Sequence, residues 1–463
     1  MHHFDLTRAP NHVGFTTEEH FLSFAIDWAL ILGERWWEGS ERSHRGFGSV
    51  AATPLDLANP TLRTAAAGLG PTTLRLGGSE SDRMSFADPS GRTGCPSVLT
   101  TGRWREIADF ADAAGMSLFV TVCAGRCSRD RSGRWTPGSF ERFAAEVAAA
   151  GDPVTIWELG NEVNGFPFIF GPRTRVTAAQ YATDYRLFRE IAGRYTPDAR
   201  CAGPAAAVWP VLGEPGPIMS AVSRRLGADL EILSWHYYPF QSRRGRIATR
   251  RWKSSVRRQT IARASARYRA SRVRRFARHA GVPSVWLSET GHALFGGEPG
   301  RSDRYMAGLW WLDHLGAMAQ EGTAGVVRQA LVGGDYGLLS TRELAPRPDY
   351  WLSILWKRTM GTAVYRLEYL DPLLRVYCHS RADGLPGRAW VIINSDTDAK
   401  AAIQVPSGGA GWVITGDAAD TSVRINGITL GPDDAPTGDA IPDPAAIPDR
   451  LNLPPLAIAF VLT

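Results

Sequence analysis

Two glutamates stand where segments of strand-like sequence end. Glu162 closes the run from Trp157 (WELGNE), and Glu289 lies in the run from Trp286 (WLSET). Hydrolysis of a glycosidic bond needs two carboxyl groups, because one protonates the leaving oxygen while the other attacks or stabilises the anomeric carbon. A tryptophan-led strand ending in Asn-Glu, followed later by another ending in glutamate, therefore points to a glycosidase. Glu158 precedes this end and is expected to lie in the strand itself.

The spacing of the two glutamates fits a barrel of alternating strands and helices. The 127 residues from Glu162 to Glu289 correspond to about three βα units of ~40 residues each, as between strands four and seven. Chemistry in such barrels lies at the carboxyl ends of the strands. Both glutamates meet that requirement.

Eight apolar, β-branched runs recur along the first 331 residues. They are Phe21–Trp28, Thr72–Gly77, Ser117–Ala124, Val154–Leu159, Arg200–Pro204, Ile232–Tyr238, Ser284–Glu289 and Gly325–Leu331. Helical periodicity is evident in Trp104–Ala114, Ser139–Ala150, Ala178–Tyr195, Val256–His279 and Tyr305–Glu321. The pattern predicts a (β/α)8 TIM barrel, in the α/β class. A doubly wound open sheet is the competing fold, but no G-x-G-x-x-G motif follows the first strand.

The texture of the sequence changes after Gly361. Short alternating runs follow, separated by Gly, Pro and Asp clusters, and no helical periodicity remains. The runs are Leu374–His379, Ala389–Asn394, Ala401–Val405, Gly411–Thr415, Ser422–Ile425 and Leu456–Leu462. This pattern predicts an antiparallel β-sandwich.

The positive charge is concentrated in arginine. The 463 residues carry a formal net charge of +6. No acidic residue occurs from Arg243 to Arg278, where arginine recurs in pairs. Such a block is either a solvated surface or a surface that binds a polyanion, and both interpretations stay open.

Other classes of function lack their sequence signals. The chain has no H-E-x-x-H, Walker or EF-hand motif, so we expect neither a metal nor a nucleotide cofactor. No run of about 18 apolar residues predicts a membrane span, and no signal peptide is visible at the start. The five cysteines are odd in number and irregularly spaced, so buried thiols are expected.

Further motifs accompany the two glutamates. They are Phe21-Leu22-Ser23 with Ile26-Asp27, Leu74 through Ser79 (LRLGGS), Trp157 through Asn164, Trp235 through Tyr238 (WHYY), Trp286 through Thr290, Arg328-Gln329 and Pro348 through Ser353 (PDYWLS). This set resembles the heparanase group, glycoside hydrolase family seventy-nine, over most of the chain. The resemblance implies a retaining β-glucuronidase.

The resemblance also implies roles for individual residues. Glu162 would be the acid/base, Glu289 the nucleophile, and Asn161 a contact of the 2-hydroxyl of the sugar being cleaved. Tyr238 would orient the nucleophile with His236 beside it; Asp27, Ser79 and Gln329 would bind sugar hydroxyls; Gly296, Gly297 and Tyr336 would hold the glucuronate carboxylate. Relatives also place a strand from the chain start in the sandwich. We therefore expect a barrel of residues 15–361 and a sandwich of residues 1–14 plus 362–463.

This chain departs from the family pattern at three places. Phe295 stands where the first of three glycines would follow the nucleophile. Ala205-Ala206-Ala207 replaces a basic pair of the mammalian relatives after the fifth strand. The stretch Asp88–Arg103 is short where mammalian chains carry an excised linker. A bacterial, single-chain type that needs no proteolytic activation is therefore expected.

The leading hypothesis is an endo-β-glucuronidase that cuts heparan sulfate or heparin. An exo-β-glucuronidase would share every catalytic residue, and a non-catalytic heparin-binding protein built on the arginine block is a third alternative. Arg243 and Arg244 follow the strand-six motif and are the arginines expected nearest the polysaccharide. We expect a monomer that is secreted or periplasmic, with no nucleic-acid partner.

Overall fold

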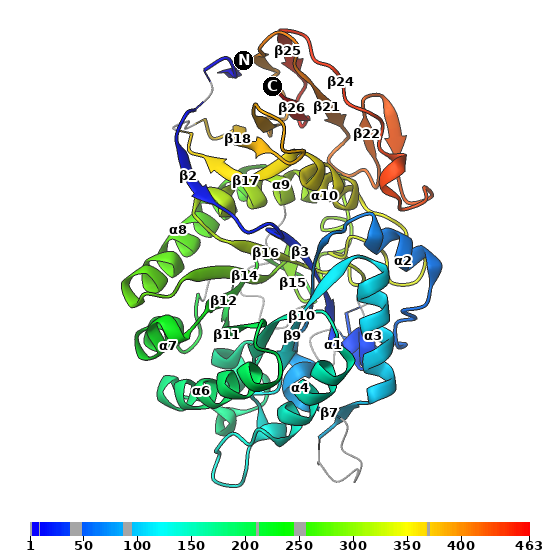
Figure 1. Ribbon diagram of the computed structural model, residues 1–463. Coiled ribbons are helices and arrows are strands. Elements are labelled where there is room, and N and C mark those ends of the chain that lie inside the picture. The colour runs from blue at the N-terminus through cyan, green and yellow to red at the C-terminus, as the bar shows by residue number, and fades with distance from the viewer. Residues whose placement is uncertain are drawn as a thin grey trace.

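The computed structural model describes residues 2–8, 10–37, 49–86, 95–209, 213–244, 256–367 and 371–463. Figure 1 shows two stacked parts, a barrel with helices around it and a smaller β-structure above it, where both chain termini lie. Within the described ranges, no helix is both long and apolar enough to cross a membrane.

Eight parallel strands close into a barrel in which every strand pairs with two neighbours. They are β3 (Leu22–Asp27), β6 (Thr72–Gly77), β9 (Met116–Val122), β10 (Val154–Leu159), β11 (Arg200–Val208), β12 (Ile232–Tyr237), β14 (Ser284–Thr290) and β16 (Gly325–Gln329). Each corresponds to one of the predicted runs, so the predicted barrel is confirmed. The strands are buried almost throughout, as expected for a parallel sheet covered by helices.

Helices alternate with these strands and cover the outside of the barrel (Figure 1). They are α2 (Pro60–Ala67), α3 (Thr101–Ala113), α4 (Gly138–Ala150), α6 (Ala178–Tyr195), α7 (Met219–Leu226), α8 (Val256–Ala280), α9 (Tyr305–Gln320) and α10 (Pro348–Thr359). In α6, Thr177 caps the first turn by accepting from the Gln180 amide, and Tyr181, Tyr185 and Phe188 face the core at helical spacing. The helices predicted from periodicity are present.

Shorter elements lie in the loops beyond the carboxyl ends of the strands. They are α1 (Trp28–Leu32), β4 (Arg35–Trp36), β5 (Val50–Ala51), the 3-10 helix η2 (Ser79–Arg83), β7 (Met84–Phe86), β8 (Ser97–Leu99), η3 (Arg126–Ser128), η4 (Val163–Gly165), α5 (Phe166–Ile169), η5 (Pro172–Thr174), β13 (Phe240–Gln241) and β15 (Ala293–Leu294). Another short helix, η6 (Gly227–Asp229), lies between α7 and β12.

The upper part consists of two sheets. The large sheet contains β2 (Val13–Thr16), β17 (Met360–Tyr365), β18 (Leu374–Arg381), β19 (Ala389–Asn394), β21 (Ala410–Thr415), β22 (Val423–Ile425), β23 (Ile428–Leu430), β24 (Ala445–Ala446) and β26 (Ile458–Leu462), and its strand pairs are antiparallel. The small sheet contains β1 (His2–Asp5), β20 (Ala401–Gln404) and β25 (Arg450–Leu453), and η7 (Gly438–Ala440) lies in a loop. Unlike the rest, β1 pairs with β20 in parallel.

Both chain ends contribute to this upper part. β1 pairs with β20, and β2 pairs with β17. These pairings support our proposed division into a barrel of residues 15–361 and a sandwich of residues 1–14 and 362–463. β2 crosses the proposed boundary between residues 14 and 15, where the chain enters the barrel. β17 crosses the boundary between residues 361 and 362, where the chain leaves the barrel.

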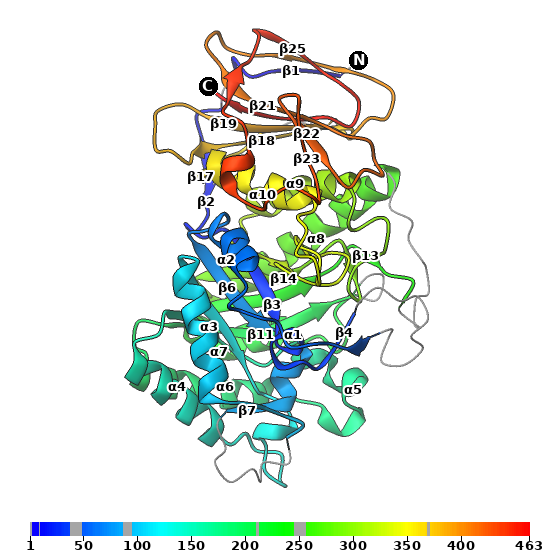
Figure 2. The same ribbon diagram turned by 90° about the vertical axis from the view of Figure 1, so that its right-hand side faces the viewer.

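Two barrel helices lie between the two parts. Figures 1 and 2 both show α9 and α10 below the sandwich and above the barrel strands. In α9, 14 of the 16 residues are buried, on all sides of the helix. The Tyr305 hydroxyl at its start donates to the Leu456 carbonyl oxygen at 2.9 Å, so the helix is bonded to the sandwich as well as packed against it. A helix that is buried all round and largely apolar is typical of such an interior position.

Candidate active site

The two predicted glutamates lie close together at the carboxyl end of the barrel. Glu162 follows β10 directly, and Glu289 belongs to β14. One side-chain oxygen of each and one ring nitrogen of His236 all lie within 4.8 Å of one another. Only 9% of Glu162 and 7% of Glu289 is exposed, so both carboxyl groups are largely removed from bulk water.

The carboxylate of Glu289 is held at both oxygens. The Tyr238 hydroxyl donates to Oε1 at 2.6 Å, and Arg75 Nη1 donates to Oε2 at 3.0 Å. Two such donors leave the carboxylate a single orientation. The structure thus places Tyr238 beside Glu289, where the sequence motif led us to expect it.

Glu162 stands on a turn with unusual backbone geometry. Its φ of 52° and ψ of 45° lie in the left-handed region, which residues other than glycine rarely adopt. The Glu162 amide donates to the Ala205 carbonyl oxygen at 2.9 Å, which fastens the turn to β11. His236 Nδ1 lies 3.5 Å from Glu162 Oε1 and 3.8 Å from Glu289 Oε2, between the two carboxyl groups. Strained backbone of this kind is common at functional sites.

Hydrogen bonds to the side-chain oxygen and the backbone amide fix Asn161 and leave its side-chain nitrogen, Nδ2, available. Its Oδ1 accepts from Arg75 Nη2 at 2.9 Å and from the Gly78 amide at 3.1 Å. Its own backbone amide donates to Asp82 Oδ2 at 2.8 Å, and Asp82 Oδ1 accepts from the Ala124 amide at 2.8 Å. Burial raises the pKa of Asp82 well above its usual value. Because Oδ1 is engaged, Nδ2 is the side-chain atom that Asn161 can offer to a substrate hydroxyl.

A buried arginine connects the site to the barrel interior. Arg75 is completely buried and donates to Glu158 Oε2 through Nε at 3.0 Å and Nη2 at 2.7 Å. The Thr121 hydroxyl also donates to this oxygen, at 2.7 Å. Burial raises the pKa of Glu158, but Arg75, His236 and the Thr121 hydroxyl together outweigh burial and lower this pKa overall. Glu158, which β10 places in the barrel wall as expected, is thus the counter-charge of Arg75.

Asp27 and Gln329 meet on the opposite side of the barrel end. Asp27 Oδ1 caps α1 by accepting from the Ala29 amide at 2.8 Å, and its Oδ2 accepts from Gln329 Nε2 at 3.3 Å. A Cβ on Gly78 would lie 2.0 Å from Asp27 Oδ2, so this position must be glycine. Ser79 follows at the start of η2, half-buried, and its hydroxyl makes no hydrogen bond to the described part of the protein.

One of the two glycine amides expected to hold the glucuronate carboxylate already has a hydrogen-bond acceptor. Tyr336 stacks on Tyr238 with ring centroids 6.2 Å apart, which links it to the Glu289 site. The Gly297 amide, however, already donates to the Ala293 carbonyl oxygen at 3.0 Å. A carboxylate bound at the Gly297 amide would have to displace that bond, and the role expected of Gly297 stays a prediction. The Gly296 amide has no backbone acceptor among the described residues.

The two arginines expected to contact a polysaccharide are paired with acidic residues. Arg244 is buried, donates through Nη1 to the Gly297 carbonyl oxygen at 3.0 Å, and forms an ion pair with Asp335. The charge of Arg244 is thus used to hold this loop, and its expected contact with a polysaccharide stays a prediction. Arg243 is partly exposed, with Nε 3.0 Å from Glu298 Oε1. Residues 245–255, which carry three of the 14 arginines of the block, lie outside the described residues.

A comparison with models of known protein families identifies the family of this chain. The sequence model described as "Glycosyl hydrolase family 79, N-terminal domain" matches residues 9–316, well over half of the chain. The chain belongs to glycosyl hydrolase family 79. This confirms the resemblance found from the motifs, and it establishes the protein as a glycoside hydrolase.

Several known proteins are similar to this chain in sequence or in structure. Heparanase from Bos taurus is 27% identical over 78% of this chain and 70% of its own. Baicalin-beta-D-glucuronidase from Scutellaria baicalensis is 24% identical over 78% of this chain and 72% of its own. The solved 4-O-alpha-L-rhamnosyl-beta-D-glucuronidase from Fusarium oxysporum 12S superimposes with a TM-score of 0.67 at 14% identity, covering 100% of both chains. At that identity, the structural likeness establishes the barrel-and-sandwich fold.

In this family 79 chain, sequence reasoning overlooked Arg75 and Asp82. Arg75 belongs to the quoted motif LRLGGS but received no role, although a charged residue inside an otherwise apolar barrel strand requires a buried counter-charge. That requirement could have pointed to Glu158. Asp82 lies in η2 and offered no such signal, because its contacts with Asn161 and Ala124 depend on the path of a loop.

The carboxylates and His236 could also be considered as ligands of a cation. Glu289 Oε2, the oxygen nearest the imidazole, already accepts from the Arg75 guanidinium. Burial lowers the pKa of His236 and so favours the neutral ring. Because a fixed positive charge 3.0 Å from the would-be ligand oxygen repels a metal ion, the donor set does not suit one.

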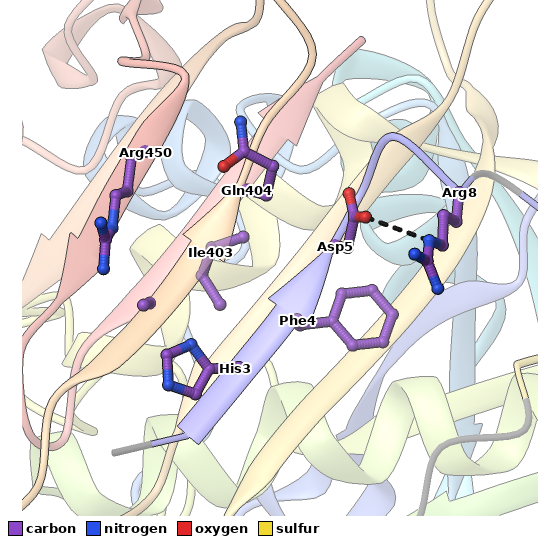
Figure 3. Close-up of a pocket in the computed structure, with 8 residues that line it drawn as sticks. His3, Phe4, Asp5, Arg8, Ile403, Gln404 and Arg450 are labelled. Atoms are coloured by element: carbon purple, nitrogen blue, oxygen red, sulfur yellow. Dashed lines mark ion pairs between the residues drawn. The ribbon is translucent and has the colours of Figure 1, made fainter.

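A hollow on the sandwich is separate from this site. It has a volume of about 460 Å³ and lies on the small sheet, lined by residues of β1, β20 and β25 together with Arg8 (Figure 3). Its single carboxyl group, Asp5, forms an ion pair with Arg8. It lacks the paired carboxyl groups that hydrolysis of a glycoside needs.

The titration of Asp27 predicts that the wild type and an Asp27→Asn variant differ in how their stability changes with pH. Burial raises the pKa of Asp27 to about 8, from 3.8 in a free chain. Between these values the folded protein binds a proton that the unfolded chain releases, so Asp27 makes the folded state less stable as pH rises. Asp27→Asn removes this titration. From pH 5 to pH 7, the wild type should lose about 3 kcal/mol of unfolding free energy relative to the variant, at ~1.4 kcal/mol per pH unit. Urea unfolding at both pH values measures it, and parallel pH profiles of the two proteins would contradict it.

Proposed function

We propose that the protein is a retaining β-glucuronidase in which Glu162 is the general acid/base and Glu289 the nucleophile. The observation that carries this proposal is the proximity of the two carboxyl groups. Their nearest oxygens, with the His236 ring nitrogen, lie within 4.8 Å. Retaining glycosidases hold the two carboxyl groups about 5–5.5 Å apart, whereas inverting enzymes need about 6.5–9.5 Å to admit water.

The fixed partners suit each group to its step. Glu289, oriented by Tyr238 and Arg75, attacks the anomeric carbon while Glu162 gives its proton to the leaving oxygen. A covalent glycosyl-enzyme and the free leaving alcohol result. Glu162 then removes a proton from water, which attacks the same carbon and releases Glu289 as a carboxylate. Asn161 Nδ2 can donate to the 2-hydroxyl throughout, because its Oδ1 is already bound.

For the substrate, we propose glucuronic acid β-linkages within heparan sulfate or heparin chains. The similarity to bovine heparanase supports this substrate. In this proposal Asp27, Ser79 and Gln329 bind sugar hydroxyls, while the Gly296 amide and Tyr336 receive the glucuronate carboxylate.

Exo-action on small β-glucuronides is a second candidate. Two observations favour it: Arg244 is already paired with Asp335, and a similar chain is a baicalin-beta-D-glucuronidase. Product length decides between the two. Heparan sulfate shortened to mid-size fragments supports endo-action, whereas single glucuronic acid units with no such fragments select exo-action.

The acid/base assignment predicts a dependence on the leaving group. Glu162→Gln should lower kcat/KM for a poor, alkyl leaving group by about 10³-fold, because general acid catalysis contributes roughly 10²–10⁴-fold. An activated aryl leaving group such as dinitrophenolate needs no proton, so kcat/KM for that substrate should fall far less. Steady-state rates on both glucuronides measure the ratio.

A control comes from Glu343→Gln, which alters an exposed glutamate in a loop and should leave both rates unchanged. Equal losses on the two substrates would remove Glu162 from the acid/base role. A product of inverted anomeric configuration, observed by NMR with the wild type, would overturn the retaining mechanism itself.

A further inference from the structure

An exposed aromatic pair lies next to the acid/base. Phe168 in α5 is 66% exposed, which is unusual for a phenylalanine. Its ring meets that of Trp209 edge-to-face, with centroids 5.4 Å apart and planes at 74°. Trp209 directly follows β11 and is only partly buried. Neither ring belongs to the apolar core.

The pair is held close to Glu162 by the backbone. A Cβ placed on Gly165 would lie 3.4 Å from Trp209 Cζ2 and 3.8 Å from Glu162 Cβ. The indole and the acid/base side chain therefore both lie within van der Waals reach of one point beside Gly165. Two hydrogen bonds fasten this loop to the end of β11: Asn164 Nδ2 donates to the Ala207 carbonyl oxygen at 3.0 Å, and the Ala207 amide donates to Asn164 Oδ1 at 2.8 Å.

The acid/base of a glycosidase faces the leaving group, because it delivers the proton to the bond being broken. Asp27, which is proposed to bind the sugar being cleaved, belongs to β3, and β11 lies on the opposite side of the closed barrel from β3. Trp209, which follows β11, thus borders the unit that departs. The strand end at this border, Ala205 through Trp209, carries no charged side chain. The strand end itself therefore offers the leaving group an aromatic ring and no cation of its own.

We propose that Phe168 and Trp209 form a stacking surface for the leaving group, and that the unit next to the scissile bond is a flat, uncharged ring. This inference rests on the proposed glucuronidase function and deepens it by naming the chemistry on the leaving-group side. An aryl aglycone and an unsulfated sugar offer the same apolar ring face, whereas a sulfate there would meet no cation of this strand end.

The test compares three β-glucuronides on wild type, Phe168→Ala and Trp209→Ala. These are β-glucuronyl fluoride, which has no ring to stack, a methylumbelliferyl glucuronide, and a glucuronide of unsulfated N-acetylglucosamine. We expect kcat/KM to fall about five- to tenfold for at least one ring-bearing substrate and less than twofold for the fluoride. The substrate with the larger loss identifies the kind of ring. Leu187→Ala, which trims an exposed leucine on α6, serves as the control.

Equal losses on all three substrates, or none on either ring-bearing one, would overturn the stacking surface. A fourth substrate is the same N-acetylglucosamine glucuronide with a sulfate on the 6-hydroxyl of the glucosamine. A higher kcat/KM of the wild type for this sulfated compound than for the unsulfated one would also overturn the proposal. Failure of the underlying function looks different: the wild type would then hydrolyse none of the compounds, the fluoride included. Because Phe168 is largely exposed, Phe168→Ala keeps the test valid even if Trp209→Ala fails to fold.

Discussion

Glu289→Gln is expected to abolish turnover and covalent labelling together. Glutamine is nearly isosteric but carries no negative charge to attack the anomeric carbon, so kcat should fall at least about 10⁴-fold. A 2-fluoro glucuronide with a good leaving group accumulates the glycosyl-enzyme. Mass spectrometry should therefore show one added sugar on the wild type, at Glu289, and none on the variant.

Folding must be separated from chemistry in this experiment. The Tyr238 hydroxyl can still donate to the glutamine oxygen, so the fold should persist, as near-ultraviolet circular dichroism would show. Glu298→Gln provides a control outside the proposed nucleophile, since that side chain pairs with Arg243. A label found on another residue of the wild type would refute the assignment of Glu289.

Replacement of Arg75 should damage both stability and rate. Arg75→Met leaves the completely buried Glu158 without its counter-charge and removes a donor from Glu289. Breaking a buried ion pair in this way costs about 3–5 kcal/mol. The loss of one fixed donor at the reacting carboxylate should lower kcat by about 10²-fold or more. Urea unfolding and steady-state kinetics measure the two effects.

The double variant Arg75→Met with Glu158→Met separates the loss of stability from the loss of catalytic rate. A buried ion pair can often be replaced by apolar side chains with little cost, so the double variant should regain most of the lost stability. Activity should stay low, because Glu289 still lacks its donor. Recovery of the rate along with stability would show that Arg75 supports the fold alone.

Much of the fold was predictable because its determinants are local. The burial of each barrel strand requires a continuous apolar run, and those runs were visible from Phe21 to Leu331. The sandwich was harder to predict in detail. Ile428–Leu430 and Arg450–Leu453 are short, and the latter alternates exposed and buried residues beside polar loops. Their pairing depends on distant partners that no local pattern reveals.

The site also has a part that local sequence predicts and a part that depends on distant contacts. Glu162 and Glu289 could be predicted because the residues at strand ends follow from the strands. Whether an amide or a guanidinium is available to a ligand depends instead on contacts across loops. The Gly297 amide is taken by Ala293, and Arg244 by Asp335. Neither partner could be inferred from sequence spacing.

The position of α9 has a consequence for attempts to dissect the protein. The helix is buried on all sides and largely apolar, with the barrel below it and the sandwich above it. A fragment that ended after the barrel would bring that upper surface into water, where exposed apolar patches of this kind drive aggregation. The sandwich therefore cannot be exchanged or removed like a tethered accessory module. Any shortened or chimeric version of the enzyme has to carry its own cover for this helix.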